Sequence, residues 1–422
     1  MTKLGRNKMV AKREMKETQT DSIFRKPVPE GVVEITGLPT GGGIVQLKDA
    51  SLMMAKDESY RLSTNDGRTW TKEQPLDCNI SVGGLIRLQS GALAVYGTKG
   101  TKDDGGHFFA SSDDEGQTWS KPSLICSSKD GIPLMHSMIQ LSTGRLLLAM
   151  YWEGLDCWES GKNSVHPEMK YEDVSAYGLW RGQRRQIEGH AHAPEMGISM
   201  VYRSDDEGKT WTKHVGGLFG WFDFEGIPNG YCGNTGCFEP AIAQTKSGSV
   251  LLIGRATVGR QIQSFSSDGG EHWSTVLPTD LPASESPAAM VSLPDSGDLL
   301  IVWNQVSREE IRRGYRRGRL SSAVSKDGGH SWENFKTLEL SEGLEDIDRI
   351  QPEYPIQMVR ARDWVGDISD GWAFFHYANI DVIGDKVFLR YSRGTPLLGV
   401  AEQNLNKQES VLRIYPRQWF YS

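Results

Sequence analysis

The chain has 422 residues, of which 38% are hydrophobic and 47 are glycine, so it can bury a large core and contains many turns. Its formal net charge of −7 gives no electrostatic basis for binding nucleic acid or an anionic membrane surface. No apolar stretch approaches the ~20 residues of a membrane helix, and residues 1–30 are charged and polar, without the apolar core of a secretory signal. We therefore expect no nucleic-acid or membrane partner, a flexible arm over residues 1–30, and a cytoplasmic protein, or a secreted or periplasmic one if a leader has been removed.

One motif, which we call the box, recurs five times: a Ser, then Asp or Asn, Gly and Trp at offsets of two, four and seven residues. These residues favour a tight turn, because Ser and Asp side chains bind downstream backbone amides and Gly accepts a positive φ. The Trp ring then packs beneath the turn. The copies begin at Ser63, Ser112, Ser204, Ser266 and Ser325.

Pairs of short apolar strands precede the boxes in a constant order. The pairs are 43–47 with 52–55, 84–88 with 93–96, 137–141 with 146–149, 240–243 with 250–253, and 288–292 with 299–302. Each unit therefore consists of strand A, a tight turn, strand B, a loop, strand C, the box and strand D. Such a unit is one four-stranded blade of a propeller, and its repetition determines the architecture.

The spacing of the box tryptophans, 49, 92, 62 and 59 residues, shows that one unit carries an insertion. A sixth unit without a box fits the chain from Tyr354 through 372–375 and 386–389 to 412–415. A strand within 31–35 would complete the last blade and close the ring. The sequence thus predicts an all-β, six-bladed β-propeller over residues 31–422, with an insertion at about 153–194 in blade 3.

The five cysteines are an odd number in a large chain, which argues against a disulfide framework. Cys232 and Cys237 are close enough to bridge, or they could join His190 and His192 in a Cys₂His₂ metal site. Their spacing is looser than a usual zinc knuckle. We therefore expect no metal and no other cofactor, with the cysteine–histidine site as the alternative.

The strand directions sort the polar residues between the two edges of the ring. The starts of strands A and C meet the ends of strands B at one edge, whereas the A–B turns and the boxes occupy the other. The first edge is expected to carry Lys56, Asp57, His136, Glu239, Arg255, Arg319, Tyr354 and His376. Each of these alone is commonly a surface or packing residue. Their equivalent placement predicts a polar cleft near the axis.

With these features the chain resembles the sialidases and the broader sialidase-like propeller glycosidases with Asp boxes. The resemblance extends from about residue 41 to 393, and the boxes are specific for the architecture rather than for an activity. Three local matches are more specific. The first is Phe-Glu-Pro-Ala-Ile at 238–242 followed by Leu-Leu-Ile-Gly-Arg at 251–255. The second is Leu-Ile-Val-Trp-Asn at 300–304 followed by Arg319, and the third is Glu-Tyr-Pro at 353–355.

The resemblance implies that Arg255 and Arg319 belong to an arginine triad that binds a substrate carboxylate, and that Tyr354 is a nucleophile activated by Glu239. Guanidiniums bind carboxylates through charge-assisted hydrogen bonds. A neutral Tyr suits an anomeric carbon that bears a carboxylate, since an anionic nucleophile would be repelled. Asp57 is the best positional match for the acid that protonates the leaving oxygen.

Blade 1 departs from the family, because residues 41–45 read Gly-Gly-Gly-Ile-Val where the first triad arginine is expected. Lys56 or His136 would then supply the third contact, with His376 as a further substrate-binding residue. The substrate would be sialic acid or another acidic sugar, such as a uronic acid. The insertion at 153–194 falls in a loop between strands B and C, so it is expected at the edge that carries the cleft. There it is either a lid that favours attack on the end of a sugar chain or a plug over the core.

The favoured function is therefore an exo-acting glycoside hydrolase of sialidase type that releases a terminal acidic sugar from a glycan or oligosaccharide. One alternative is a polysaccharide lyase or other uronate-modifying enzyme, in which Tyr354 or His136 moves a proton. The other is a non-catalytic carbohydrate-binding propeller, since a fold alone does not establish a function.

Overall fold

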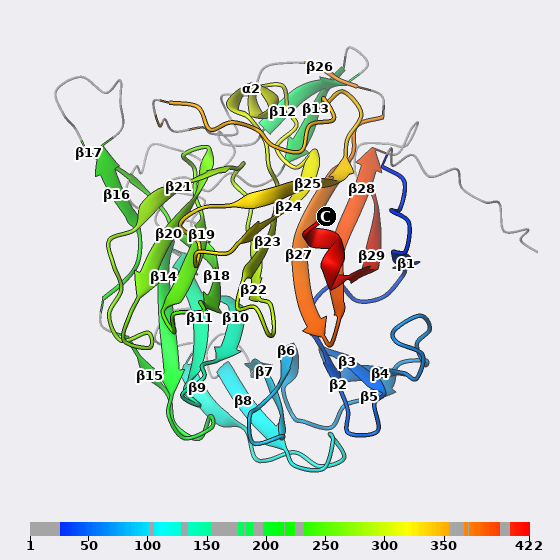
Figure 1. Ribbon diagram of the computed structural model, residues 1–422, viewed down its shortest axis with the longest axis vertical. Helices are drawn as coiled ribbons and strands as arrows, with labels where there is room; N and C mark the ends of the chain where they lie inside the picture. Colours follow the sequence, from blue (N-terminus) through cyan, green and yellow to red (C-terminus); the bar gives the residue numbers. More distant parts are fainter. Residues whose placement is uncertain are drawn as a thin grey trace, which may run out of the picture.

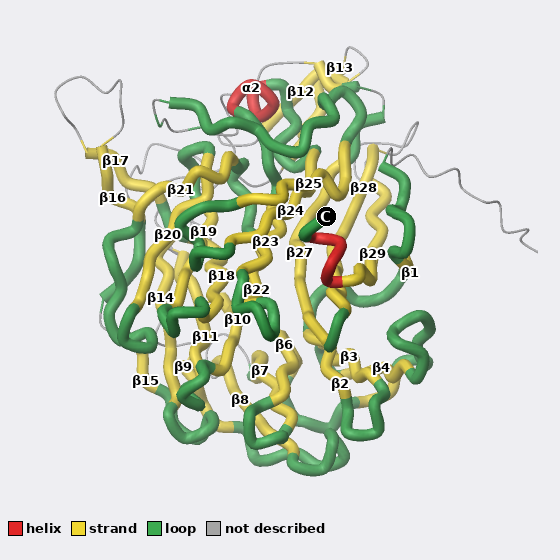
Figure 2. Tube along the Cα trace, viewed as in Figure 1, coloured by secondary structure: helices red, strands yellow, loops and turns green. Residues whose placement is uncertain are grey.

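Six four-stranded antiparallel sheets form a ring of blades, which confirms the predicted six-bladed β-propeller (Figure 1). The computed structural model describes residues 26–100, 105–127, 134–153, 176–180, 183–188, 197–214, 216–223, 232–354, 356, 359, 367–369, 371–396 and 406–422. Figure 2 shows how strands and loops dominate this part of the chain, whose helical segments are α2 (Arg308–Arg312) and the short 3₁₀ turn η4 (Arg417–Phe420). None of its helices is long and apolar enough to cross a membrane.

The strands follow one another from the inner to the outer edge in the first five blades. Blade 1 contains β2 (Gly43–Gln46), β3 (Leu52–Lys56), β4 (Ser59–Ser63) and β5 (Gln74–Pro75), and blade 2 contains β6 (Ser81–Arg87), β7 (Leu93–Lys99), β8 (Gly106–Ser112) and β9 (Ser123–Ser127). Blade 3 contains β10 (Leu134–Gln140), β11 (Leu146–Glu153), β14 (Gly197–Ser204) and β15 (Thr212–Lys213). Blade 4 contains β18 (Phe238–Gln244), β19 (Val250–Arg255), β20 (Arg260–Ser266) and β21 (Leu277–Pro282), and blade 5 contains β22 (Ala289–Ser292), β23 (Leu299–Trp303), β24 (Arg319–Ser325) and β25 (Glu333–Leu340).

The second strand of each of these blades is buried on both faces, because neighbouring blades cover it. Strands β19 and β23 are buried at every position. Leu147 of blade 3 and Leu252 of blade 4 belong to one apolar cluster, and Leu251 of blade 4 and Ile301 of blade 5 belong to the next. Burying each such side chain contributes about 1.5–3 kcal/mol, so the continuous apolar runs of the sequence hold successive blades together.

The boxes form the predicted turns between the third and fourth strands. In the third copy, Asp206 Oδ1 accepts hydrogen bonds from Ser204 Oγ (2.8 Å) and from the Thr210 amide (2.9 Å), and Trp211 Nε1 donates to the Gly208 carbonyl (3.0 Å). Gly208 has a φ of +86°, and a Cβ there would lie 2.2 Å from Phe109 Cε1. Only glycine fits this turn, because both the backbone conformation and the neighbouring blade exclude a side chain.

The N-terminal strand closes the ring, as the sequence predicts. Strand β1 (Val33–Thr36) pairs antiparallel with β29 (Asn406–Pro416), the third strand of blade 6. Glu34 on β1 pairs with Arg393 (2.9 Å) and Arg413 (2.7 Å), and Arg413 also pairs with the buried Glu339 of blade 5 (2.9 Å). Charged groups thus join the closing strand to both of the last two blades.

The predicted start of blade 6 at Tyr354 is wrong. Its inner strand is β27 (Phe374–Ile383), followed by β28 (Lys386–Pro396), β29 and β1. Residues from 341 onward instead connect blades 5 and 6 by way of blade 4, where the Val359 amide donates to the Thr257 carbonyl (2.7 Å). Polar residues such as Asp381 interrupt the apolar pattern of β27, so the sequence conceals this long strand.

The insertion of blade 3 lies between β11 and β14, at the predicted edge of the ring. Its hairpin, β12 (Ala176–Trp180) and β13 (Gln183–Glu188), pairs with β26 (Asp367–Ile368) from the connection between blades 5 and 6. These strands lie at the top of the view in Figure 1. Most of the predicted lid lies outside the described residues. A second hairpin, β16 (Gly220–Asp223) and β17 (Cys232–Thr235), lies beside the outer strand of blade 4.

Candidate functional site

Glu239 lies near the start of the inner strand of blade 4, in a distorted stretch of backbone. Its φ is +44°, and the pairing of β18 with β19 shifts register between Phe238 and Ala241. A left-handed conformation costs a residue with a side chain about 1–2 kcal/mol. The distortion holds the Glu239 side chain, only 6% exposed, in a buried charge cluster at this edge.

Four charged side chains alternate in sign through this cluster. Arg255 Nη1 donates to Glu239 Oε2 (2.7 Å), Arg255 Nη2 lies 3.5 Å from Glu285 Oε1, and Arg316 Nη2 donates to Glu285 Oε2 (2.8 Å). Burial by itself would lower the pKa of Arg255, but the carboxylates of Glu239 and Glu285 outweigh burial and raise it. Arg255 therefore remains a cation, as buried charges do when they are paired.

Tyr377 faces Glu239 from the inner strand of blade 6. It also has a left-handed backbone, with a φ of +50°, and the pairing of β27 with β28 shifts register between His376 and Asn379. The Tyr377 side chain lies close enough to Glu239 to be affected by its charge, and it remains 46% exposed. Burial and the charge of Glu239 raise the pKa of Tyr377, although the nearby guanidiniums of Arg317 and Arg255 oppose that rise.

Arg317 joins Tyr377 to the neighbouring His376. Its Nη1 lies 2.6 Å from His376 Nδ1, and its guanidinium lies 5.3 Å from the centre of the Tyr377 ring. Because arginine can only donate, His376 Nδ1 is the acceptor and the imidazole is neutral. Burial, and then the positive charge of Arg317, lower the pKa of His376 to about 2.

The cluster therefore places a Tyr–Glu pair beside several guanidiniums. Among the described residues these belong to Arg255, Arg316 and Arg317, and Glu239 and Glu285 supply carboxylates. Glu239 is the carboxylate nearest in effect to the phenol of Tyr377, and a neighbouring carboxylate can act as a base toward a phenol. Guanidiniums so close to the phenol can bind an anionic group through charge-assisted hydrogen bonds.

The BNR repeat-like domain family matches residues 85–369, which is 285 of the 422 residues. The chain belongs to this family. No curated protein sequence matches the chain. The BNR repeat-like assignment agrees with the resemblance inferred from the boxes, since the matched region contains four of the five copies.

Solved structures similar to this BNR repeat-like chain include two glycosidases at low identity. An alpha-L-arabinanase of Penicillium chrysogenum complexed with arabinobiose is 13% identical, with 92% of this chain and 98% of that one covered and a TM-score of 0.49. A Trypanosoma rangeli sialidase in complex with 2,3-difluorosialic acid, described as a covalent intermediate, is 12% identical, with 91% and 59% covered and a TM-score of 0.45. A Dyadobacter fermentans protein of unknown function is 12% identical, with 90% and 97% covered and a TM-score of 0.48.

Of the residues predicted for the site, the structure brings Glu239, Arg255 and His376 together and places Arg319 elsewhere. Arg319 is fully buried, and its guanidinium donates to both carboxylate oxygens of Glu310 on α2 (3.0 and 3.1 Å) and to the Gln305 carbonyl (3.2 Å). These contacts make Arg319 an anchor for α2 rather than a member of the Tyr–Glu cluster.

Tyr354 lies over the outer strands of blade 4, where it does not pair with Glu239. Its hydroxyl donates to Asp280 Oδ1 (3.0 Å), and the guanidinium of Arg260 lies 4.4 Å from its ring centre. The phenol that the structure pairs with Glu239 is that of Tyr377.

Lys56 and Asp57 lie together at the end of β3 in blade 1, with Lys56 Nζ 3.6 Å from Asp57 Oδ2. A Cβ at Gly41, within the stretch where the family arginine is expected, would lie 3.1 Å from Lys56 Cε. Both side chains line a cavity of about 890 Å³ that also includes Thr40, whose carbonyl accepts a hydrogen bond from Asn379 (3.0 Å). This cavity therefore adjoins the strand that carries Tyr377.

Some predicted groups lie wholly or partly outside the described residues. His136 lies in β10, but its side chain is not among those described, and the same holds for Cys232 in β17. His190 and His192 lie outside the described residues, whereas Cys237 is a buried free thiol. Among the described residues, no group of three or more His, Cys, Asp or Glu side chains is placed to hold a metal ion.

The sequence reasoning missed Tyr377, Glu285, Arg316 and Arg317. The run Arg312–Arg319 is the densest basic segment of the chain, and this was a usable signal for the two arginines. Nothing in the sequence marks Glu285. Tyr377 could be found only by recognising that the inner strand of blade 6 begins at Phe374.

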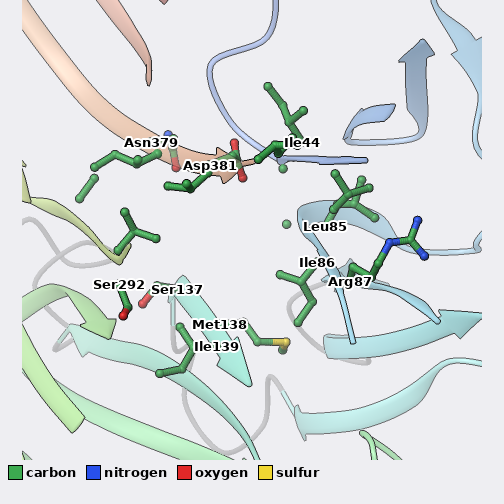
Figure 3. Close-up of a pocket in the computed structure, with 18 of the residues that line it drawn as sticks. Ile44, Leu85, Ile86, Arg87, Ser137, Met138, Ile139, Ser292, Asn379 and Asp381 are labelled. Carbon is green, nitrogen blue, oxygen red and sulfur yellow. The ribbon is translucent and has the colours of Figure 1, made fainter. Parts of the chain in front are cut away.

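The axial channel of the propeller forms a separate cavity of about 790 Å³ (Figure 3). Apolar residues of three inner strands line it: Ile44 of β2, Leu85 of β6, and Met138 and Ile139 of β10. It reaches the A–B turns at the box edge. Its charged lining residues include Lys48, Arg87, Asp381 and Arg390. Burial raises the pKa of Asp381, against the opposing effect of the nearby Arg390 guanidinium (2.6 Å).

Proposed function

We propose that this BNR repeat-like protein is an exo-acting glycoside hydrolase of sialidase type, which releases a terminal acidic sugar from a glycan. The observation that carries the proposal is the placement of Tyr377 beside Glu239, among the guanidiniums of Arg255, Arg316 and Arg317. The acidic sugar would be sialic acid or a related one such as a uronic acid. Its carboxylate would bind to guanidiniums of this cluster.

In the proposed reaction, Tyr377 Oη attacks the anomeric carbon while Glu239 takes the phenol proton. The bond to the leaving oxygen breaks, and that oxygen receives a proton from an acid. The product is a covalent aryl glycoside on Tyr377, which water then hydrolyses as the proton transfers run in reverse. A neutral phenol suits this role because the substrate carboxylate would repel an anionic nucleophile.

Arg316 and Arg317 are the proposed binding groups for the substrate carboxylate, and His376 holds Arg317 in place. Lys56 is the proposed replacement for the missing arginine of blade 1, since its side chain lies against Gly41. Asp57 remains the proposed acid for the leaving oxygen. Its exposure and its position in the cavity beside Thr40 support that role.

The test is hydrolysis of a panel of aryl glycosides that includes sialic acid and uronic acids. We expect turnover of an acidic member and a loss of roughly 10³-fold in kcat for Tyr377→Phe and for Glu239→Gln, within the range for removing a general base. Tyr354→Phe is the matched control and should keep its activity, because Tyr354 does not contact Glu239.

A fluorinated trap identifies the nucleophile directly. A 2,3-difluoro analogue of the substrate sugar should add one glycosyl group to the peptide that contains Tyr377 and none to the peptide that contains Tyr354. Turnover that survives Tyr377→Phe would contradict the proposal. Products with the absorbance of an unsaturated uronate would show that the protein is a lyase and not a hydrolase. If no glycoside is turned over, the alternative is a non-catalytic carbohydrate-binding propeller.

A further inference from the structure

Tyr354 is a large aromatic side chain that the protein holds out into solvent in a fixed orientation. It is 67% exposed. Its hydroxyl is bound by Asp280 (3.0 Å), and one face of its ring rests on the guanidinium of Arg260, 4.4 Å from the ring centre. Such contacts remove the rotational freedom of an exposed ring, which costs entropy and returns little apolar burial.

The support beneath this ring is rigid, because Arg260 is buried and otherwise occupied. Arg260 Nη1 donates to the Thr279 carbonyl (3.2 Å), and Nη2 donates to the Glu353 carbonyl. One face of the Tyr354 ring is thus backed by a fixed cation. The exposure of the side chain leaves apolar ring surface open to a ligand.

The charges around Tyr354 are sorted by depth. The cations are the deeper groups, with side-chain exposures of 4% for Arg260 and 16% for Arg308. Their acidic partners face solvent, at 71% for Asp280 and 46% for Glu353. A ligand that reaches the ring therefore meets carboxylate oxygens. They accept hydrogen bonds from hydroxyl groups and repel another carboxylate.

The distance between Tyr354 and the Tyr–Glu pair follows from the strand order of blade 4. Glu239 lies on the innermost strand, β18, and Asp280 lies on the outermost strand, β21. Three strand spacings of ~4.8 Å separate these positions by roughly 14 Å. A short oligosaccharide can span that distance and a single sugar cannot.

We propose that Tyr354 is a stacking subsite for a neutral sugar on the leaving-group side of the glycan. The carbon face of a pyranose packs on the ring, and its hydroxyls bind Asp280. The inference rests on the proposed function for the acidic end of the substrate. It adds that the acidic terminal sugar is attached to a neutral glycan and is not part of an acidic homopolymer.

Steady-state kinetics on two substrates tests the subsite. For an oligosaccharide with an acidic terminal sugar on neutral sugars, Tyr354→Ala should raise KM about 10-fold without changing kcat, whereas Tyr354→Phe should stay near wild type. The glycosyl fluoride of the same acidic sugar has no leaving-group glycan, so all variants should cleave it alike. Trp221→Ala, which removes an exposed aromatic from β16, is the matched control and should leave both substrates unaffected.

Two results would overturn the inference: an unchanged KM for the oligosaccharide in Tyr354→Ala, or equally efficient cleavage of an acidic homopolymer by the wild type. If no substrate is hydrolysed, the proposed function fails but the subsite can still be tested. Lactose is then the probe, and saturation-transfer NMR should show binding to the wild type and its loss in Tyr354→Ala. Equal lactose signals from both proteins would overturn the subsite by itself.

Discussion

The two edges of the ring are built on different principles. At the box edge one turn is repeated, and carboxylates such as Asp206 bind backbone amides. At the opposite edge the described residues show no such repeated turn, and the carboxylate of Glu239 binds a guanidinium beside the phenol of Tyr377. Left-handed residues occur at both edges, but those of the boxes fall at equivalent turn positions, whereas Glu239 and Tyr377 each adjoin a shift in strand register. The repeated turns thus indicate the architecture, whereas the irregular backbone at Glu239 and Tyr377 indicates the candidate active site.

The sharpest test of this contrast is Tyr377→Asn. Asparagine tolerates the left-handed backbone that Tyr377 adopts, at a φ of +50°. We expect turnover to fall roughly 10³-fold while the free energy of unfolding stays the same or rises by up to about 1 kcal/mol. Paired kinetics and urea unfolding measure both quantities. A large loss of stability would mean that Tyr377 is a structural residue.

At the box edge the opposite outcome is expected from Gly208→Ala, with Gly91→Ala as its matched control. Both glycines have a φ near +90°, but a Cβ at position 208 meets Phe109 at 2.2 Å and a Cβ at position 91 meets nothing within 4 Å. Backbone strain costs each variant about 1–2 kcal/mol, and the clash adds about 1–3 kcal/mol at position 208. Thermal and urea unfolding should separate the two variants, and those that fold should keep kcat. Equal stability losses would show that blade packing does not constrain the box.

At the edge opposite the boxes, His376 should make the free energy of unfolding fall as the pH is lowered. Its pKa is about 2 in the folded protein and ~6.5 when unfolded, so between these values only the unfolded chain takes up the proton. Stability is therefore lost as pH falls below 6.5, by about 2 kcal/mol between pH 7 and pH 5. His376→Gln keeps an acceptor for Arg317 and should remove that part of the pH dependence. Urea unfolding at both pH values is the measurement, and identical slopes would contradict the prediction.

The smallest expected effect is a gain at the box edge from Glu207→Gly. Glu207 has a φ of +56°, and the fourth and fifth boxes place Gly269 and Gly328 at the equivalent position. Relief of backbone strain outweighs the extra entropy of an unfolded glycine by about 0.5 kcal/mol. A small rise in Tm with unchanged activity is expected. A fall in Tm would show that the Glu207 side chain stabilises its turn.

The sequence was sufficient for the fold because its signals are local. Each box spans eight residues and carries its own hydrogen-bonding groups, so its turn can be inferred without knowing the rest of the molecule. The closing strand was also predictable, since an open propeller would leave an unpaired edge. Blade 6 was misread because it lacks a box and its inner strand carries polar residues such as Asn379 and Asp381.

The site was predictable only in part. Glu239 and Arg255 follow from a local match in a regular blade, and the structure joins them directly. Tyr377 depends on a register shift in β27, which turns its side chain toward a blade more than 130 residues earlier in the chain. Such a shift arises from three-dimensional packing rather than from local preference. Because blade 6 was expected to begin at Tyr354, this tyrosine was predicted to be the nucleophile. The structure places Tyr354 over the outer strands of blade 4 instead.

The closing strand has a consequence for the order of folding during synthesis. Val33 pairs with Ile414, so β1 must wait until the other strands of the ring have been made. Until then β1 has no partner, and its exposed edge can pair with other chains. Contacts so distant in sequence also make folding slow. The ring is therefore exposed to misassembly until β29 has been made, and a chaperone that shields the open edge of β1 would raise the yield of folded protein.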